Sequence, residues 1–389
     1  MKWIKKTDRL PIKSWCENVE TGAMKQAENL AELSVTYGHI ALMPDCHVGY
    51  GMPIGGVIGC WNAVIPNAVG VDIGCGVIVA RTDFSASELR RDQIGKILSR
   101  TRRDVPVGFN HHKHEQSWEG WASAPKQCPP VSQELDSARK QLGTLGGGNH
   151  FIEIQAGDDG YVWLMVHSGS RNFGLKIAEH YHQKALNFCE DKAMAVPSRD
   201  LAYFPADINK AEEYLEAMRF AMRFAARNRE IMMERFSESA MGVLGCKVET
   251  VVNIHHNYCA EETHFGRKLM VHRKGATAAF KGQTGVIPGS MGTASYIVKG
   301  LGNEESFMSC SHGAGRRMGR NDACRKLSVE DCNRAMQGIE FGHWSRDRRG
   351  NLDLSEAPQA YKDIDEVMAA QPDLVEVVAK VKPLGVIKG

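Results

Sequence analysis

Residue types that bind metal ions gather in several glycine-rich segments of the chain. Asp72 and Cys75 stand three positions apart in VDIGCG. His150 lies in GGGNHFIE, His167 ends the apolar run of VWLMVHSGSR, and His256 lies in NIHHNY. Carboxylate, thiolate and imidazole groups are common donors to divalent metals, so this set predicts a site for one or two ions. Thiolate and imidazole donors favour zinc over manganese.

Each of these segments has a simpler interpretation when it is taken alone. VDIGCG is also typical of a glycine turn that buries a small cysteine, and a single histidine at a strand end is more often structural. Of the neighbouring His255 and His256, only one can face a given side of a strand. The donors are also too scattered for a zinc finger. The metal hypothesis therefore depends on the combination.

A different chemistry is indicated by His312 in SCSHGAGRRMGR. Glycines leave its ring accessible, and Arg316 follows four positions later. A neutral imidazole can attack a phosphoryl group through one nitrogen while the other donates a hydrogen bond that fixes the tautomer. The alternative is a glycine-rich turn with a structural histidine. The segment 288–295, PGSMGTAS, offers backbone NH groups to a phosphate but matches no established nucleotide fingerprint.

The elements that would position these residues are only partly regular. Short glycine-rich β elements are predicted over 39–82, and further strands in the segments that carry the histidines. Helices are predicted over 85–101, where Ser85 is a plausible N-cap, over 132–143 and over 209–240. The uneven spacing of the strands favours an α+β fold of mixed β-sheets with peripheral helices.

No repeat or linker divides the sequence, so we expect a single catalytic domain over 1–389. The polar segment 105–130 is interpreted as a variable surface loop. Its His111, His112 and His114 have no cysteine or carboxylate at a fixed spacing, so they are predicted to be solvated and not to bind metal.

Composition limits the classes of function. The 389 residues are 43% hydrophobic and 24% charged, which is ordinary for a globular chain. The net charge is only +2, so a polyanion would need a local basic cleft. No apolar run is long enough for a transmembrane helix, and the basic start leads into no signal-peptide core, so we expect no membrane association. Eleven scattered cysteines favour a reducing, cytoplasmic location over a disulfide framework.

A series of motifs occurs in a distinctive order: MPDCHVGYG, VGVDIGCG, GTLGGGNHFIE, VHSGSR, HHNY, PGSMG, GNEESF, CSHGAGR and a terminal VIKG. With these motifs the sequence resembles the RtcB family of RNA-splicing ligases, from about residue 39 to the last residue. The resemblance implies an RNA ligase that joins 2′,3′-cyclic-phosphate or 3′-phosphate ends to 5′-hydroxyl ends, with GTP and two Mn²⁺ ions. Zn²⁺ or another divalent metal is an alternative for the isolated protein. The segment 105–130 matches no shared motif.

The resemblance also implies roles for individual residues. The metal ligands would be Asp72, Cys75, His150, His167 and His256, with Cys75 shared by both ions. His312 matches the histidine that becomes guanylylated, and Asp45 matches an acidic residue that takes part in the chemistry. The nucleotide contacts would come from Asn149, His150, Phe151, Ile152, Glu153, His256, Asn257, Pro288, Gly289, Ser290, Met291, Ser295, His312, Gly313, Ala314, Gly315 and Lys388.

Broken RNA and GTP are the expected partners, and an archease-type activator is left open. RNA contacts are predicted for Arg171, Arg316 and Lys299, because basic groups bind phosphates. The alternative function is a metal-dependent phosphodiesterase or phosphatase that acts on RNA ends without ligation; it would need the metal ligands but not His312. An RNA-binding module without catalysis would leave the metal-binding residues unexplained.

Overall fold

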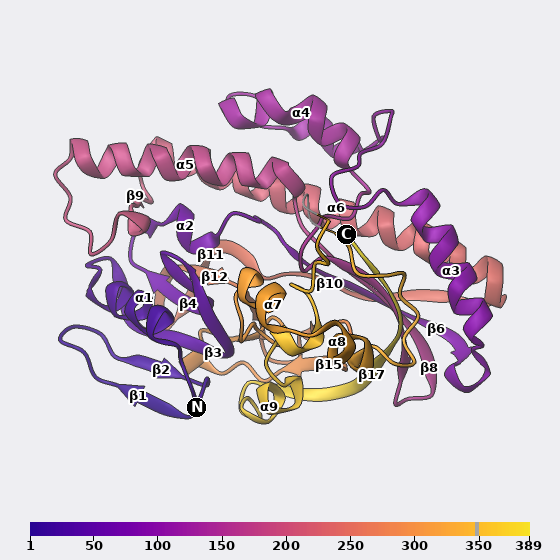
Figure 1. Cartoon of the computed structure of the whole chain (residues 1–389). Coiled ribbons are helices and arrows are strands. Elements are labelled where there is room, and N and C mark those ends of the chain that lie inside the picture. Colours follow the sequence, from indigo (N-terminus) through magenta and orange to yellow (C-terminus); the bar gives the residue numbers. More distant parts are fainter. Residues whose placement is uncertain (347–349) are drawn as a thin grey trace.

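Two main β-sheets organise the computed structural model, which describes residues 1–346 and 350–389 (Figure 1). The six-stranded sheet is mixed and has the order β1 (Trp3–Lys5), β2 (Ile12–Ser14), β3 (Thr36–Tyr50), β4 (Met52–Cys60), β12 (Arg267–Lys274) and β11 (Asn257–His264). The seven-stranded sheet is antiparallel and has the order β10 (Val248–His255), β6 (Gly76–Ser85), β8 (Tyr161–Ser168), β7 (Phe151–Gly157), β17 (Val375–Lys388), β15 (Ser295–Gly300) and β14 (Thr284–Ile287). Two short pairs join β5 (Ala63–Val64) to β9 (Phe204–Pro205), and β13 (Ala276–Ala278) to β16 (Ser309–Ser311).

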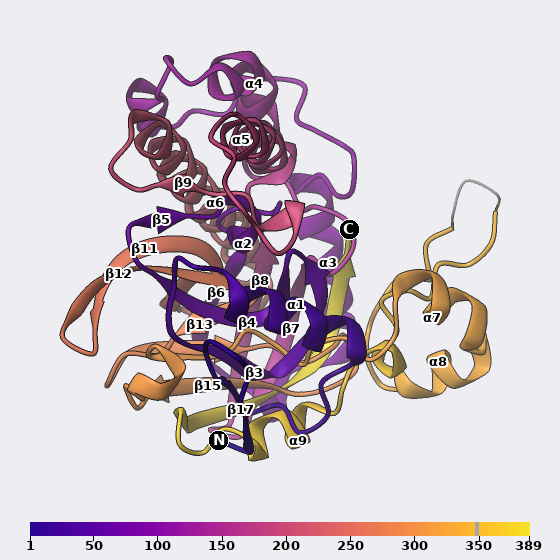
Figure 2. The same cartoon turned by 90° about the vertical axis from the view of Figure 1, so that its left-hand side faces the viewer.

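The helices lie outside the sheets, and Figure 2 shows α7 and α8 set beside the main body. The α-helices are α1 (Thr21–Glu32), α2 (Pro66–Val69), α3 (Arg91–Asp104), α4 (Pro129–Gln141), α5 (Arg171–Asp191), α6 (Asn209–Leu244), α7 (Arg320–Lys326), α8 (Val329–Ala335) and α9 (Ile364–Ala369). The longest of them, α6, packs across β10, β6 and β8. It therefore supports the side of the seven-stranded sheet that begins with the edge strand β10.

Both faces of the seven-stranded sheet are covered. On one face, Ile78 and Val166 pack in an apolar cluster with Phe236 of α6. On the other face, Val77 packs in a cluster with Trp344 of the C-terminal segment. Because successive side chains of a strand point to opposite faces, strands buried on both faces are apolar at nearly every position. This explains the unbroken apolar runs GVIVA and YVWLMV, and it holds the ends of β6 and β8 firmly in place.

The α+β expectation of mixed sheets with peripheral helices is confirmed, and the predicted helix over 209–240 is α6. The predicted helix over 85–101 begins too early. Ser85 is the last residue of β6, and a short 3-10 turn separates it from α3. The helix is capped by Arg90 instead: its backbone NH donates to the side chain of Gln93 at 2.9 Å. A serine at the end of a strand imitates an N-cap in the sequence.

The segment 105–130, interpreted as a variable surface loop, contains both irregular and helical structure. The chain is irregular up to residue 118, and His111 and His114 are exposed there as predicted. The prediction of a solvated His112 is wrong, because this ring is half-buried and its Nε2 lies 3.0 Å from Nη1 of Arg235. A 3-10 helix then covers Glu119–Ser123, and α4 begins at Pro129. Trp121 in this segment is buried in the main core cluster, because aromatic side chains hold it against α6.

None of the helices in the described residues is long and apolar enough to cross a membrane. The eleven cysteines are all free thiols. The long helix α5, which follows directly after the histidine-bearing strand β8, was not anticipated from the sequence.

Candidate active site

Five neighbouring strands of the seven-stranded sheet bring candidate residues to the same edge of it. The register pairs His255 with Gly76, Gly76 with Ser168, Phe151 with His167, and Lys388 with Phe151. Because the strands are antiparallel, β6 and β7 begin at this edge while β10, β8 and β17 end there. His256, Cys75, His167, His150 and Lys388 therefore follow one another along the edge, although the sequence separates them widely.

A compact group of metal-binding atoms lies at this edge. The Sγ atom of Cys75 is 3.4 Å from Nε2 of His150 and 3.3 Å from Nε2 of His167, and all three residues are buried. Asp72 extends the group, since its Oδ2 lies 3.0 Å from Nε2 of His150. The ring of His256 is 5.2 Å from that of His167, measured between centroids. All five predicted metal ligands thus meet in one place.

The donor set fits a divalent metal ion. Nδ1 of His167 is 3.2 Å from the carbonyl oxygen of Asn149, which leaves the lone pair of Nε2 directed toward Cys75 when Nδ1 carries the proton. Burial, together with the neighbouring imidazoles, lowers the pKa of His167 and of His256 well below the usual value, so both rings are neutral as metal ligands must be. Burial also raises the pKa of the Cys75 thiol, a cost that a bound cation would remove by stabilising the thiolate.

His312 is held by a buried carboxylate from the other sheet. Oδ2 of Asp45 accepts from the His312 backbone NH at 3.0 Å, from its Nδ1 at 2.7 Å and from the Gly313 backbone NH at 3.2 Å. Asp45 is completely buried, which would raise its pKa, but the charge and hydrogen bond of His312 lower it. The His312 ring is 4.7 Å from that of His256 between centroids, so the imidazole adjoins the metal-binding group.

Glycines allow the chain to pack closely around Asp45. Gly55 and Gly315 both have positive φ values, and a Cβ atom on Gly315 would lie only 2.2 Å from the carbonyl oxygen of Asp45. The Nζ atom of Lys362 donates to the carbonyl oxygens of Pro44 at 3.2 Å and Cys46 at 2.6 Å, on either side of the aspartate. Lys362 was not identified from the sequence. The close approach of Gly315 to Asp45 explains why the HGAGR segment has a glycine at this position.

Some of the predicted nucleotide residues lie close to the His312 segment. The backbone of Pro288 adjoins Gly313, and Ser295 Oγ accepts from the backbone NH of Gly289 at 3.1 Å. Both polar atoms of the Asn257 side chain have backbone partners. Its Nδ2 donates to the Asp72 carbonyl at 3.0 Å, and its Oδ1 accepts from the backbone NH of Gly275 at 2.7 Å. Asn257 therefore links the backbone at Asp72 to the backbone at Gly275.

Phe151, Ile152 and Glu153 follow His150 along β7 and alternate between its two faces. Ile152 packs in the cluster beneath α3 and α6, away from Phe151, so only its backbone can reach a ligand. Burial raises the pKa of Glu153 to about 8, although Gln155 and Lys388 oppose this. Oε2 of Glu153 accepts from Nε2 of Gln155 at 2.8 Å, while its buried Oε1 has no partner. Glu153 thus presents an unused acceptor.

The C-terminus belongs to the same region. Lys388 lies 3.5 Å from Oε2 of Glu356, and its side chain is 22% exposed. The last residue, Gly389, packs against the backbone of Gly146, whose neighbouring turn leads into His150. The VIKG and GTLGGGNH motifs therefore touch. Glu356, which also pairs with Arg316 at 3.1 Å, was not identified from the sequence.

The three predicted RNA contacts lie in different surroundings. Arg171 donates from Nη2 to the carbonyl of Gly108 at 2.5 Å, and Arg316 donates to the carbonyl of Ser355 at 2.6 Å. Both are therefore engaged inside the protein. Lys299 is exposed, but it lies four residues along β15 from Ser295, or about 13 Å away.

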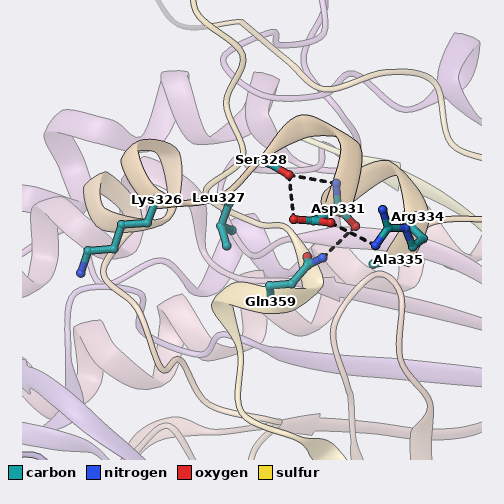
Figure 3. A pocket seen from close by; sticks show the side chains of 7 residues that line it. All are labelled: Lys326, Leu327, Ser328, Asp331, Arg334, Ala335 and Gln359. Carbon is teal, nitrogen blue, oxygen red and sulfur yellow. Dashed lines mark hydrogen bonds and ion pairs between the residues drawn. The ribbon is translucent and has the colours of Figure 1, made fainter.

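A surface pocket of about 440 Å³ lies apart from this site, beside α7 and α8 (Figure 3). It is lined by Lys326, Leu327, Ser328, Asp331, Arg334, Ala335 and Gln359. The polar groups bond one another: Ser328 Oγ accepts from the backbone NH of Asp331 at 3.1 Å, and Gln359 donates to the Asp331 carbonyl at 2.9 Å. The pocket contains none of the candidate residues.

A cluster of a thiol and two imidazoles that could hold a metal ion, beside a histidine bonded to a buried carboxylate, is typical of metal-dependent phosphoryl-transfer enzymes. Comparison with known proteins makes this class more specific. A sequence model described as tRNA-splicing ligase RtcB matches residues 26–131 and 111–389. The chain belongs to the RtcB family.

Relatives from bacteria and archaea match along nearly their whole length. The RNA-splicing ligase RtcB of Escherichia coli (strain K12) is 40% identical, over 98% of this chain and 98% of its own. The tRNA-splicing ligase RtcB of Nanoarchaeum equitans is 34% identical, over 95% of this chain and 92% of its own. The RNA-splicing ligase RtcB of Mycobacterium bovis is 31% identical, over 94% of this chain and 100% of its own.

Proposed function

We propose that this protein is an RNA ligase that joins 2′,3′-cyclic-phosphate or 3′-phosphate ends to 5′-hydroxyl ends and uses GTP. Family membership and the names of the relatives support the reaction class. The observation that supports the mechanism most is the hydrogen bond of 2.7 Å between His312 Nδ1 and Asp45, beside the cluster of Cys75, His150 and His167.

His312 would act as the nucleophile. With its Nδ1 proton donated to Asp45, the lone pair of Nε2 is free to attack the α-phosphorus of GTP. A nitrogen–phosphorus bond forms, the bond to the β-phosphate breaks, and pyrophosphate leaves. The carboxylate of Asp45 would stabilise the positive charge that develops on the imidazole, as buried carboxylates do for catalytic histidines. The protein then carries a histidine-linked guanylate.

The RNA steps would use this guanylate. A cyclic phosphate end is first opened by water to a 3′-phosphate. An oxygen of that phosphate attacks the guanylate phosphorus, and the bond to His312 breaks. The 5′-hydroxyl then attacks the activated RNA phosphate, loses its proton and displaces GMP. One GTP is thus consumed for each bond, because phosphate itself is a poor leaving group.

Two divalent ions, proposed to be Mn²⁺, would be held by Asp72, Cys75, His150, His167 and His256. When bound, such ions neutralise charge on phosphoryl oxygens during transfer. Glu153 and Lys388 would bind the guanine nucleotide, since Glu153 Oε1 is a free acceptor for guanine NH groups. RNA contacts by Arg171, Arg316 and Lys299, an archease-type activator and a cytoplasmic location belong to the same proposal.

Labelling of the protein by GTP tests the proposal directly. The purified chain is incubated with α-³²P-GTP and Mn²⁺ and separated on a denaturing gel. We expect a labelled band that is stable in alkali and lost in acid, as a phosphoramidate is. His312→Ala should abolish it, and His343→Ala, a matched change at an exposed histidine, should not.

The same samples are then given RNA with 3′-phosphate and 5′-hydroxyl ends. Joined product with the wild type, and none with His312→Ala, supports ligation. An unlabelled protein that dephosphorylates or shortens the RNA would instead identify the hydrolase alternative.

A further inference from the structure

The long helix α6 supplies none of the predicted ligands, yet a buried arginine in it lies directly behind them. Arg229 is completely buried. Its Nη1 donates to the carbonyl oxygens of Gly74 at 2.9 Å and Ser168 at 3.0 Å, and its Nε donates to Oδ1 of Asn253 at 2.8 Å. A single guanidinium therefore contacts three separate segments of the backbone and sheet.

The preceding residue extends this contact to a fourth segment. Asn228 is also completely buried. Its Oδ1 accepts from the backbone NH groups of Gly143 at 2.7 Å and Thr144 at 3.1 Å, and its Nδ2 donates to the carbonyl of Gly169 at 3.2 Å. Gly143 begins the glycine-rich segment GTLGGGNH, which ends at His150. Two consecutive residues of α6 thus bind all the segments that carry imidazole ligands.

We infer that Arg229, assisted by Asn228, is a positioning residue that fixes the backbone segments of Cys75, His167 and His256 for metal binding. Gly74 precedes Cys75, Ser168 follows His167, and Asn253 lies three residues before His256 on β10. The inference rests on the proposed function, because it assumes that these residues bind metal.

Only arginine suits this position. Its planar fork donates in several fixed directions, whereas a lysine ammonium offers a single compact charge that cannot span the same three acceptors. Loss of the guanidinium would remove a donor from the carbonyls of Gly74 and Ser168 and would leave Gly74 with only its contact to Nδ1 of His255 at 2.8 Å. These segments would then shift to find new partners. Removal of a group that hydrogen-bonds to a metal ligand commonly lowers the metal affinity by about 10–100-fold.

Binding of Co²⁺ to the metal-free protein measures this effect without catalysis. Co²⁺ bound by a cysteine thiolate gives a ligand-to-metal charge-transfer band, and the titration gives its dissociation constant. We expect Arg229→Met to weaken Co²⁺ binding by roughly 10–100-fold and Arg229→Lys to restore it only in part. Arg227→Met is the matched control, because Arg227 lies on the outer side of the same helix and pairs with Glu234.

The outcomes separate the inference from the proposal on which it rests. A wild-type protein without the thiolate band would overturn the metal site and with it the proposed function. A wild-type protein that binds Co²⁺, with Arg229→Met binding equally well, would overturn only the role of Arg229. Equal losses in Arg229→Met and Arg227→Met would also overturn it, since the effect would then not depend on the buried contacts.

A milder variant keeps the test valid if Arg229→Met does not fold. Asn253→Ala removes the acceptor of Arg229 Nε and leaves the guanidinium in place. We expect Co²⁺ binding to be weaker by about 10-fold, the lower end of the same range, at an unchanged circular dichroism spectrum. Unchanged affinity in this variant would contradict the inference.

Discussion

The two halves of the candidate site are held in different ways. The metal-binding half lies at the edge of the seven-stranded sheet, where strand pairing aligns Cys75, His150 and His167, and α6 fastens their backbone from behind. In the nucleophile half, β16 directly before His312 pairs with β13, and Asp45 accepts three hydrogen bonds from the His312 segment. Backbone contacts thus support both halves, but a single buried carboxylate orients the imidazole of His312.

Because of this difference, we expect substitutions in the two halves to have separate effects on guanylylation and on metal binding. A change in the nucleophile half should stop guanylylation while metal binding persists. A change in a metal ligand should stop both, because the proposed transfer needs the ions to neutralise phosphoryl charge.

Loss of the central thiol should have the largest effect. We expect Cys75→Ala to abolish Co²⁺ or Mn²⁺ binding and to reduce guanylylation and ligation by more than about 1000-fold, because Cys75 adjoins both His150 and His167. Metal analysis and GTP labelling measure this. Cys332→Ala is the matched control, since that thiol is equally buried but lies in another cluster. Full activity of Cys75→Ala would exclude a central role for the thiol.

Removal of the carboxylate charge should have the next largest effect. In Asp45→Asn, the amide cannot supply the charge that orients and stabilises the His312 imidazole, so guanylylation should fall by about 100- to 1000-fold. The Co²⁺ affinity, measured by titration, should stay within about twofold, because Asp45 contacts no predicted ligand of the metal except through His312. If Asp45→Asn lost the metal as well, the two halves would not be independent.

The sequence could predict the metal-binding half because that half follows from local rules. Cys75, His150, His167 and His256 all adjoin strand ends, and antiparallel pairing of neighbouring strands brings such ends to one edge. The same local patterns predicted α6. They failed at residues 85–90, where Ser85 imitates an N-cap but ends a strand, and at α5, which was not anticipated after the VHSGS turn.

Residue patterns alone indicated His312 but not its partner Asp45 in the nucleophile half. Asp45 and His312 are 267 positions apart, and their contact depends on the irregular register of β3 between Leu42 and His47. The glycine-rich segment SCSHGAGR indicated His312, and the resemblance to a family supplied Asp45, but neither gave the hydrogen bonds between them. Arg229 was missed for a related reason: a charged residue in a helix is normally solvated, and its burial becomes visible only when the sheet beneath it is known.

The C-terminal lysine should have a smaller effect on the reaction. We expect Lys388→Met to reduce guanylylation by about 10- to 100-fold, since a charge-assisted contact to the nucleotide is lost. The thermal unfolding midpoint should change little, because the side chain ends a strand and is partly exposed. Lys380→Met is the control on the same strand; that lysine is also partly exposed and pairs with Asp365. Equal activity of both variants would remove Lys388 from the site.

The smallest effect concerns stability and its dependence on pH. The pKa of Glu153 is raised to about 8 by burial, against an ordinary value of 4.5. Between these two values the folded chain holds a proton that the unfolded chain has lost, so the side chain's contribution to stability is full below pH 4.5 and falls as the pH rises toward 8. Glu153→Gln removes this loss. From pH 5.5 to pH 7, the free energy of unfolding of the wild type should fall by about 2 kcal/mol relative to that of the variant. This corresponds to roughly 2 to 3 °C in the unfolding midpoint.

Calorimetry of wild type and Glu153→Gln across this pH range measures the difference, and Glu376→Gln, at an exposed position of β17, serves as the control. If the difference in unfolding midpoint between the two proteins widens as the pH rises, Glu153 is protonated in the absence of nucleotide. Binding of guanine, whose NH groups favour the ionised carboxylate, should then release a proton and narrow the gap. A gap independent of pH would mean that Glu153 is already ionised in the folded protein, and the unused acceptor at its Oε1 would need another partner.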